Sequence, residues 1–474
     1  MIILEGEIDI FCKHRAIFAL VLFFALPVCE LEARDVYVRL SGGSSFNIGV
    51  TSGYLTMTDA QGRLINLGDS ANLTISGGNV NAGSFSFPLP ARIRGDGLLK
   101  FNGKTYRGAF MLTQKSGLLN VVDVEQYLCG VLPAEVGATW HMQALRAQAI
   151  TARTYVLRQS MNRASKGYDV VDTDADQVYK GAGVETDKTN QAVASTSGEI
   201  LTYGKEIAQT YFHSDSGGHT ADISDVWGQS VPYLQGVPEV VSYKSPVSSW
   251  SAKISAAKIQ SAITKITGTD IGPISQIQVS EVDEGGRAVT MTFTGSRGTK
   301  TIRASQFRTN VDPRTLKSTM FTPSGGSYSV NNTATPSGLV SMKIGNGKTF
   351  GANELSFEEE QGIAKMTAEG IFTTTELIDM LTNPDKKKQY YQAGLTRTKK
   401  GSTQASQPSP QKKQRTKYGY AIEKSGNDFV FYGRGWGHGV GMCQWGAMAM
   451  AEQGYTAEKI LMHYYPGTAI RKFK

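Results

Sequence analysis

The stretch from Gly433 to Ala447, GRGWGHGVGMCQWGA, constrains the fold of this chain more than any other. Six of its fifteen residues are glycine, and glycine lets a backbone adopt positive φ and approach another surface closely. Trp436, His438, Gln444 and Trp445 stand among the glycines, whereas flexible linkers are rich in Gly and Ser without aromatic residues. The stretch therefore predicts a rigid, shaped surface that forms one wall of a cleft.

Upstream of this stretch the hydrophobic pattern changes from strand-like to helix-like. Residues 35–114 alternate short apolar runs with Gly, Asn and Asp, which is typical of antiparallel strands joined by hairpins. Residues 118–124 predict one more strand. Trp140 to Gln159 contains no Gly or Pro and repeats apolar residues at helical spacing, so it predicts a helix with Thr139 as its N-cap. Mixed strands and turns continue to about Phe321.

Near the C-terminus the pattern again indicates helices. Gln444 to Gln453 predicts a short helix that Gly454 terminates, and Thr456 is placed to cap a last helix that ends before Pro466. Together the patterns predict an α+β fold, with a β-rich mixed domain, a few helices and a long insertion before the C-terminal Gly-rich segment.

Residues 326–425 have the composition of an insertion. Residues 356–381 predict a small helical piece, while Lys386 to Lys417 contains ten basic and no acidic residues. We predict a disordered segment at 386–417, because this composition cannot bury a core. The segment would either attract an anionic cell wall or membrane, or serve as a solvated linker. The formal net charge of +8 resides largely here, which argues against a nucleic-acid-binding surface on the fold itself.

Residues 1–33 have the pattern of an export signal. Ala16 to Val28 is an unbroken apolar run behind basic residues. It is too short to span a bilayer comfortably but fits the hydrophobic region of a signal peptide. We predict a signal peptide or an uncleaved N-terminal anchor, and hence a chain exported to the cell wall, the periplasm or the outer side of the membrane. There Cys129 and Cys443 either pair or remain separate buried thiols.

Five segments carry the most distinctive residue patterns. They are YLCGVLPAEV (Tyr127 to Val136), ALRAQAITARTY (Ala144 to Tyr155), YFHSDSGGHTADISDVWG (Tyr211 to Gly228), the Gly433 to Ala447 stretch, and HYYPGT (His463 to Thr468). In this order and spacing they resemble the stage II sporulation protein D family, whose studied members are peptidoglycan lytic transglycosylases. The resemblance implies one catalytic domain over residues 34–325, with a β-rich part at 34–115, completed by residues 426–474. Nothing about the insertion at 326–425 carries over.

Glu135 matches the family's catalytic glutamate, and its neighbours support that role independently. Leu132, Pro133, Val136 and Trp140 are apolar, so a carboxyl held among them loses hydration and its pKa rises. Such a carboxyl can donate a proton to a glycosidic oxygen near neutral pH. Glu135 would lie in a turn just before the predicted helix and face a cleft, or else only complement that helix's dipole as a helix-start carboxylate.

The resemblance implies a reaction that needs one carboxyl. Glu135 would protonate the bond between N-acetylmuramic acid and N-acetylglucosamine. Its carboxylate would then deprotonate the muramic C6 hydroxyl, which attacks C1 and leaves a 1,6-anhydro end. The attack is intramolecular, so its entropic cost is low. A hydrolase would need a second carboxylate; Asp123 and Glu125 are near in sequence, but spacing does not show whether they face the same cleft.

Further side chains are predicted to bind the glycan or to support the site. Gln148 and Tyr155 share a face of the predicted helix and Arg153 points elsewhere, so Arg153 either supports the active-site wall or forms a structural ion pair. Trp436 would stack on a sugar ring or pack in the core, and His438 would contact hydroxyls or cap the backbone. The full predicted set is Gln148, Arg153, Tyr155, His213, Ser214, Gly217, His219, Trp436, His438 and Gln444.

His213 and His219 flank the tight turn SDSGG. Some members of the family bind zinc through His and Cys in this neighbourhood, but no Cys lies between Tyr211 and Gly228. Structural zinc takes four N, S or O ligands. We therefore predict substrate contact or turn stabilisation for both histidines and no cofactor, with a zinc site as the alternative.

Three functions fit these patterns. The first is a secreted lytic transglycosylase that acts on peptidoglycan glycan strands in cell-wall remodelling or sporulation. The second is a non-catalytic peptidoglycan-binding module that enhances a cell-wall amidase, since some members of the family are labelled amidase enhancers. The third is a muramidase that hydrolyses the same bond. None of them involves nucleic acid, and membrane contact is predicted only through an uncleaved N-terminal segment.

Overall fold

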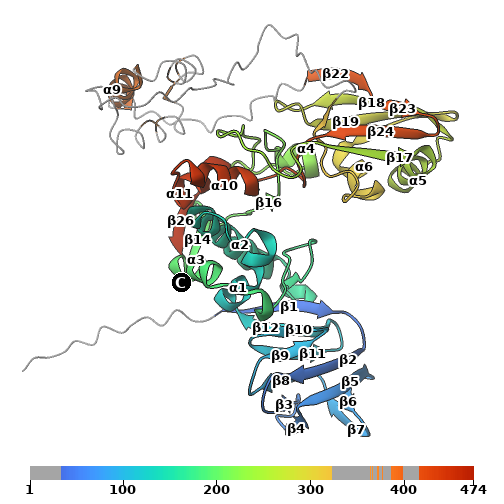
Figure 1. Ribbon diagram of the computed structural model, residues 1–474, viewed down its shortest axis with the longest axis vertical. Helices are drawn as coiled ribbons and strands as arrows, with labels where there is room; N and C mark the ends of the chain where they lie inside the picture. The colour runs from blue at the N-terminus through green and yellow to red at the C-terminus, as the bar shows by residue number, and fades with distance from the viewer. Residues whose placement is uncertain are drawn as a thin grey trace, which may run out of the picture.

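The computed structural model describes residues 34–322, 386–398 and 416–473, together with single positions between 363 and 380. Helices and strands are both abundant in these ranges, which confirms the predicted α+β class. Three parts follow one another in space: an N-terminal β lobe, a central helical part and a second lobe of strands and helices (Figure 1). In the described ranges, no helix is long and apolar enough to cross a membrane. The predicted leader at 1–33 lies outside these ranges.

The N-terminal lobe consists of two sheets around one hydrophobic core. The first sheet has the strand order β13-β1-β12-β11-β8-β3-β4 and the second β10-β9-β2-β5-β6-β7. Most strands alternate buried and exposed residues, as expected when one face packs on a core. The strands are β1 (Asp35–Ser41), β2 (Ser45–Val50), β3 (Leu55–Thr58), β4 (Leu64–Gly68), β5 (Ser70–Ser76), β6 (Asn79–Ala82), β7 (Phe85–Pro88), β8 (Ala91–Gly95), β9 (Leu99–Phe101), β10 (Lys104–Tyr106), β11 (Ala109–Thr113) and β12 (Gly117–Asp123).

Two helices follow the last strand of this lobe. β12 runs into α1 (Val124–Glu135), whose N-cap Asp123 accepts backbone N–H groups through its side chain. The sequence pattern does not predict α1. The helix predicted from Trp140 to Gln159 is confirmed as α2 (Met142–Asn162). Its N-cap is His141 and not Thr139, because the His141 side chain accepts the N–H of Gln143.

Helix α2 is the centre of the middle part and packs against α1, α3, α10 and α11. The predicted C-terminal helices are confirmed as α10 and α11, and Thr456 caps α11 as expected. The last strand, β26, returns to pair with β14. The remaining elements of this part are the 3-10 turns Ala164–Lys166 and Ala182–Val184, β13 (Val170–Val171), α3 (Asp187–Ser195), β14 (Glu199–Tyr203), β15 (Glu206–Ile207), β16 (Phe212–His213), α4 (Ile223–Trp227), β25 (Met442–Cys443), α10 (Gln444–Glu452), α11 (Ala457–Tyr464) and β26 (Ala469–Lys472).

A second lobe with its own hydrophobic core lies between α4 and β25 in the sequence. One of its sheets has the order β17-β24-β21, with β23 also paired to β24, and the other has the order β20-β19-β18-β22. Phe293, Phe307 and Phe431 are fully buried in its core. Its elements are β17 (Trp250–Ser255), α5 (Ala256–Thr267), β18 (Ile274–Val282), β19 (Ala288–Gly295), β20 (Gly298–Arg303), α6 (Ala304–Val311), β21 (Phe321–Thr322), β22 (Thr416–Ala421), β23 (Glu423–Ser425) and β24 (Asp428–Gly433).

The structure corrects two predictions about the insertion. Its end was placed at 425, but β22 already pairs with β18 of the second lobe, so residues from 416 onward belong to that lobe. The prediction of disorder at 386–417 is wrong for α9 (Lys387–Thr398) and for the start of β22. Of the predicted helical piece at 356–381, positions 363, 366, 376 and 380 are described as helical, and the rest lies outside the described residues.

Candidate active site at the end of helix α1

Glu135 is the last residue of α1, not a residue in a turn before a helix. The alternative of a helix-start carboxylate is therefore also wrong, because the C-terminal end of a helix disfavours negative charge. The backbone N–H of Val178 donates to Glu135 Oε1 at 2.6 Å. Burial raises the pKa of Glu135 to about 7, against the opposing effects of the Val178 N–H and the Gln444 side chain. This is the direction that the apolar neighbours predicted.

The Gly-rich stretch reaches Glu135 through the start of α10. β16 and β25 form a short parallel pair, in which His213 lies beside Cys443. Gln444 follows immediately as the first residue of α10, and its side chain acts on the Glu135 carboxyl. The rings of Trp140 and Trp445 lie 5.2 Å apart between centroids. The loop after α1 and the start of α10 are thus held together, although they are distant in sequence.

The glycines of this stretch allow close packing against the segment that begins at Tyr211. Gly441 has φ of +72°, and a Cβ at this position would lie 2.0 Å from the backbone oxygen of Tyr211. Gly437 has φ of +121°, and its Cβ would lie 2.6 Å from Cβ of His213. Any larger residue would separate the two segments. The stretch is therefore a packed backbone layer, in agreement with the rigidity predicted from its composition.

An aromatic cluster continues the site from β16. The ring centroid of His438 lies 5.6 Å from His213 and 5.1 Å from Trp227, and Tyr211 lies 4.8 Å from Trp227. Trp227 is 40% exposed, so the cluster has a solvent-facing side. Sequence reasoning quoted Trp227 within a motif but did not select it as a site residue. In the sequence DVWG, the large aromatic Trp227 stands directly before the glycine that ends the helix, and this position could have identified it as a site residue.

The two neighbouring histidines, His213 and His438, are neutral near pH 7. Burial and the neighbouring His438 hold the pKa of His213 well below its usual range, and burial lowers the pKa of His438 to about 3. The Nδ1 atom of His438 accepts the N–H of Val440 at 3.1 Å, which is the backbone-capping alternative. Both rings can therefore exchange hydrogen bonds with a ligand but cannot supply a positive charge.

Two predicted site residues carry buried polar atoms without hydrogen-bond partners among the described residues. These atoms are both amide atoms of Gln148 and Nε2 of His213. Gln148 shares its face of α2 with Thr151, which contacts Met442 of β25, and with Tyr155, which packs on Phe212 of β16. Native proteins pair nearly all buried polar groups. The unsatisfied atoms of Gln148 and His213, on elements that contact β25 just before α10, mark a candidate ligand site.

Arg153 and Tyr155 have other partners. Arg153 is fully buried and binds Glu125 of α1 with two hydrogen bonds, Nε to Oε1 at 2.8 Å and Nη2 to Oε2 at 2.6 Å. Of the two alternatives for Arg153, the structure therefore has the structural ion pair and not a support of the active-site wall. This ion pair fixes α1 from the side away from Gln148. The hydroxyl of Tyr155 donates to Asp176 Oδ1 at 2.9 Å.

The remaining predicted residues are spread around the SDSGG turn. The carbonyl of Ser214 accepts the N–H of Trp445, and Gly217 has φ of +75° with its N–H bound to Asp215. Trp436 is 41% exposed beneath the Lys317 ammonium, which excludes the core-packing alternative. His219 Nδ1 lies 2.7 Å from the carbonyl of Thr220. No group of three His, Cys, Asp or Glu side chains that could hold a metal occurs in the part of the chain that the structure describes.

A buried polar network behind the turn was not predicted. Ser216 Oγ donates to Glu239 at 2.7 Å, the hydroxyl of Tyr464 donates to the same carboxyl at 2.6 Å, and the hydroxyl of Tyr243 lies 3.1 Å from the Cys443 sulfur. Cys443 caps α10 with its side chain, and both it and Cys129 are free thiols. This network fixes β25 and α10. The two thiols are unpaired in the structure, as in the second cysteine alternative, but only Cys443 is fully buried.

Comparison with known proteins agrees with the motifs. Residues 113–203 match the family model described as Stage II sporulation protein, SpoIID. Stage II sporulation protein D of Bacillus subtilis is 27% identical, over 74% of this chain and 74% of that protein. The protein named Amidase enhancer of Bacillus subtilis is 27% identical over 73% of this chain but only 40% of its own length. An uncharacterized protein of Brachyspira hyodysenteriae is 26% identical, over 78% and 73%. The matched segment holds Glu135, Gln148 and Arg153, and these matches confirm the predicted resemblance to the stage II sporulation protein D family.

Proposed function

We propose that this chain is an exported lytic transglycosylase that cuts the bond between N-acetylmuramic acid and N-acetylglucosamine in peptidoglycan. Glu135 acts first as general acid and then as general base. The position of its carboxyl supports this most directly, because the group is partly buried, bound to one backbone N–H and has a pKa of about 7. A group with such a pKa occupies both protonation states near neutral pH, which suits donation followed by recapture of a proton.

The surroundings of Glu135 favour a reaction with one catalytic carboxyl. Asp123 caps α1 and Glu125 is bound by Arg153, so both carboxylates that lie nearby in sequence are engaged elsewhere. Attack by the muramic C6 hydroxyl needs no activated water and is intramolecular. Asp174, whose charge raises the pKa of Glu135, is the residue that hydrolysis would use as a second carboxylate.

The unpartnered polar atoms supply contacts for the sugar. Gln148 offers an amide group and His213 offers a neutral ring nitrogen, while the Gln444 side chain acts on the Glu135 carboxyl. Hydroxyl and acetamide groups of the glycan are matching donors and acceptors. Polar groups of this kind can stabilise the positive charge that develops at C1 without introducing a second ion. The half-exposed ring of Trp227 adds an apolar surface on which a sugar can pack.

The test is a digest of purified sacculi, analysed by mass spectrometry. The wild-type chain is expected to release 1,6-anhydro muropeptides, and Glu135→Gln to lose this activity by about 10²-fold or more, because removal of a general acid–base typically has that effect. Glu423→Gln, an exposed carboxyl in β23, is the control and keeps its activity. Circular dichroism checks that Glu135→Gln is folded. Wild-type activity in Glu135→Gln would refute the assignment, and reducing muramic ends, heavier by one water, would indicate a hydrolase.

A second candidate is a non-catalytic peptidoglycan-binding module that enhances a cell-wall amidase. The similarity to a Bacillus subtilis protein named Amidase enhancer favours it. The same side chains would then hold the glycan and present it to the amidase. Co-sedimentation with sacculi, combined with an amidase digest, separates the two functions. Binding that accelerates stem-peptide release but creates no new glycan ends supports the second function.

A further inference from the structure

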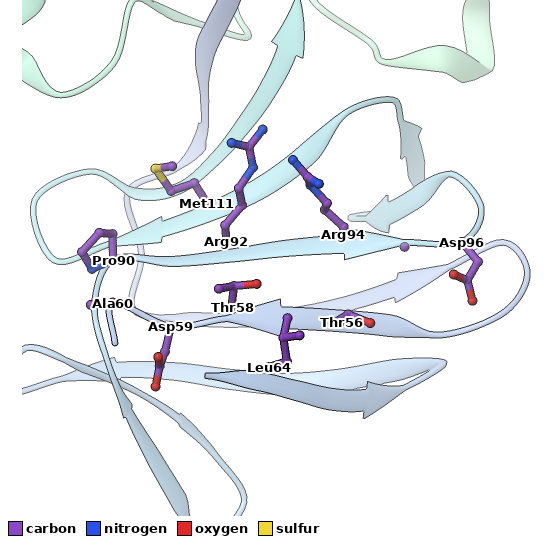
Figure 2. A pocket seen from close by; sticks show the side chains of 11 residues that line it. Thr56, Thr58, Asp59, Ala60, Leu64, Pro90, Arg92, Arg94, Asp96 and Met111 are labelled. Atoms are coloured by element: carbon purple, nitrogen blue, oxygen red, sulfur yellow. The ribbon is translucent and has the colours of Figure 1, made fainter. Parts of the chain in front are cut away.

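A groove of about 710 Å³ lies on the outer face of the first sheet of the N-terminal lobe (Figure 2). It is formed mainly by β3, β4, β8 and β11, and none of its lining residues belongs to the site around Glu135. Alternate residues of the central strands are buried in the core, among them Met57 on β3 and Ile93 on β8. Their neighbours along the strands, Thr56, Thr58, Arg92 and Arg94, therefore point to the opposite face and line the groove.

The strand register places these side chains in rows across the sheet. Arg92 pairs with Met111 of β11 on one side and with Thr58 of β3 on the other. Arg94 pairs with Thr56. In Figure 2 the two arginine side chains extend side by side from β8, beside Met111 and opposite the threonines. Two residues along a strand span about 7 Å, so the Cα atoms from which the two arginine side chains extend are separated by about that distance.

The acidic residues of the groove are already engaged, whereas Arg92 has one exposed ion-pair partner and Arg94 has none among the described residues. Asp59 accepts the backbone N–H groups of Gln61 and Arg63 and pairs with the Arg63 side chain. Asp96 accepts the N–H of Tyr54. Arg92 reaches only the exposed Asp35, at 3.6 Å, and its Nε atom is buried without a partner. Arg94 has no hydrogen-bond or ion-pair partner among the described residues.

We infer that this groove binds the carboxylates of peptidoglycan stem peptides through Arg92 and Arg94. A planar guanidinium binds a carboxylate with two parallel hydrogen bonds, and the threonine hydroxyls supply further donors. Met111, Pro90 and the 75% exposed Leu64 give apolar contacts next to the charges. Such contacts suit the small apolar side chains of a peptide, whereas the backbone of a polyol phosphate polymer carries no such side chains. The choice of peptidoglycan as the polymer rests on the proposed function.

In functional terms, the N-terminal lobe would anchor the chain to peptide-bearing wall while the Glu135 site acts on glycan. Exposed ion pairs are weak and fall further as salt screens them. The groove would therefore supply modest, salt-sensitive affinity. It would also favour regions of the wall in which the stem peptides are still attached.

The test is co-sedimentation with purified sacculi, carried out in the Glu135→Gln background so that the wall stays intact. Arg94→Gln is expected to weaken binding about 2- to 5-fold, and Arg92→Gln with Arg94→Gln about tenfold, since exposed ion pairs contribute little individually. Lys100→Gln removes the same charge from an exposed position on β9 in the other sheet, and is expected to bind like the Glu135→Gln parent.

Two treatments of the sacculi identify the ligand. Removal of stem peptides with an amidase should abolish the difference between the arginine variants and the parent, and hydrofluoric acid, which strips phosphate polymers, should preserve it. Unchanged binding by the double variant would overturn the inference, as would a difference that disappears with the phosphate polymers or persists on peptide-free glycan. These outcomes are independent of the Glu135→Gln digest, so failure of the groove and failure of the proposed reaction remain distinguishable.

Discussion

At the scale of single residues, Glu135 is an ionisable carboxyl in an environment that favours its neutral form. Its carboxyl lies at the C-terminal end of α1, is partly buried, and receives one backbone N–H from Val178. A group in that setting holds its proton more strongly in the folded state than in the unfolded chain. The pKa of about 7, against 4.5 as the ordinary value, therefore has a consequence for stability that is independent of any catalytic role.

The first prediction at this scale concerns pH and unfolding. Because the folded pKa lies above the unfolded one, protonation of Glu135 stabilises the fold at low pH, and this contribution is lost as pH rises through about 7. Glu135→Gln has no such titration. The free energy of unfolding of this variant, relative to wild type, should increase by about 2 to 3 kcal/mol between pH 5 and pH 8. Urea denaturation at both pH values measures it.

The control for this prediction is Glu423→Gln, which removes an exposed carboxyl in β23. An equal difference at pH 5 and pH 8 for Glu135→Gln would mean that the carboxyl titrates normally in the folded chain.

How far the sequence predicts this site depends on the range of the contacts. Apolar neighbours of Glu135 are local, so the direction of its pKa shift could be predicted. Its contacts with Val178 and Gln444 join segments that are far apart, and only the folded chain reveals them. Arg153 shows the reverse problem: helical spacing places it correctly on the face away from Gln148, but its partner Glu125 lies on a helix that the pattern missed.

At the scale of secondary-structure elements, helix α1 shows why sequence patterns fail locally. Gly130 and Pro133 lie inside it, and both residue types normally disfavour helices. A Cβ at position 130 would lie 2.6 Å from the Tyr179 ring and 2.8 Å from the Gly181 carbonyl. Tertiary packing therefore requires glycine at this point, at the expense of local propensity. Helices α2 and α11 contain neither residue type and were predicted from their periodicity and caps, and α10 was predicted although Gly446 lies in its first turn.

The second prediction concerns the contact between the Gly-rich stretch and the Tyr211 segment. Gly441→Ala combines a positive φ, which costs about 1–2 kcal/mol for a residue with a Cβ, with a 2.0 Å contact to the Tyr211 oxygen. Gly454→Ala has a comparable φ of +85° but meets nothing within 4 Å. The difference in unfolding free energy between the two variants, measured by urea denaturation, should be about 1–3 kcal/mol, with Gly441→Ala the less stable.

Equal destabilisation of the two glycine variants would show that the Gly-rich stretch can separate from the Tyr211 segment without lowering the free energy of unfolding. In that case the close approach of β16 and β25 would not be what holds Gln444 beside Glu135.

At the scale of the whole molecule, the described residues form three large hydrophobic cores that share no buried residue. One fills the N-terminal lobe and extends to α1 and α2, one lies around α10 and α11, and one lies within the second lobe. Composition and periodicity show strands in both lobes but do not show that residues from 250 onward form a separate body. In the sequence, the long insertion interrupts the second lobe, because strands β22 and β24 of that lobe come after it.

The third prediction follows from these separate cores. Phe293 packs on Phe307 in the second lobe and Phe110 lies in the N-terminal core, both fully buried. Phe293→Ala should lower one calorimetric transition by about 10 °C or more and leave the other in place, and Phe110→Ala should do the opposite, because each cavity affects only its own cooperative unit. A single transition that both variants lower equally would indicate that the lobes unfold together.

The pairing of Trp250 with Gly433 has a further consequence. The chain therefore enters the second lobe and leaves it at adjacent backbone positions, and Arg287 and Ser305 of that lobe make further contacts with Ser216 and Val226. The second lobe can therefore differ in length between relatives without moving α10 away from Glu135. Relatives that retain the framework are therefore free to differ in size here while keeping the same chemistry.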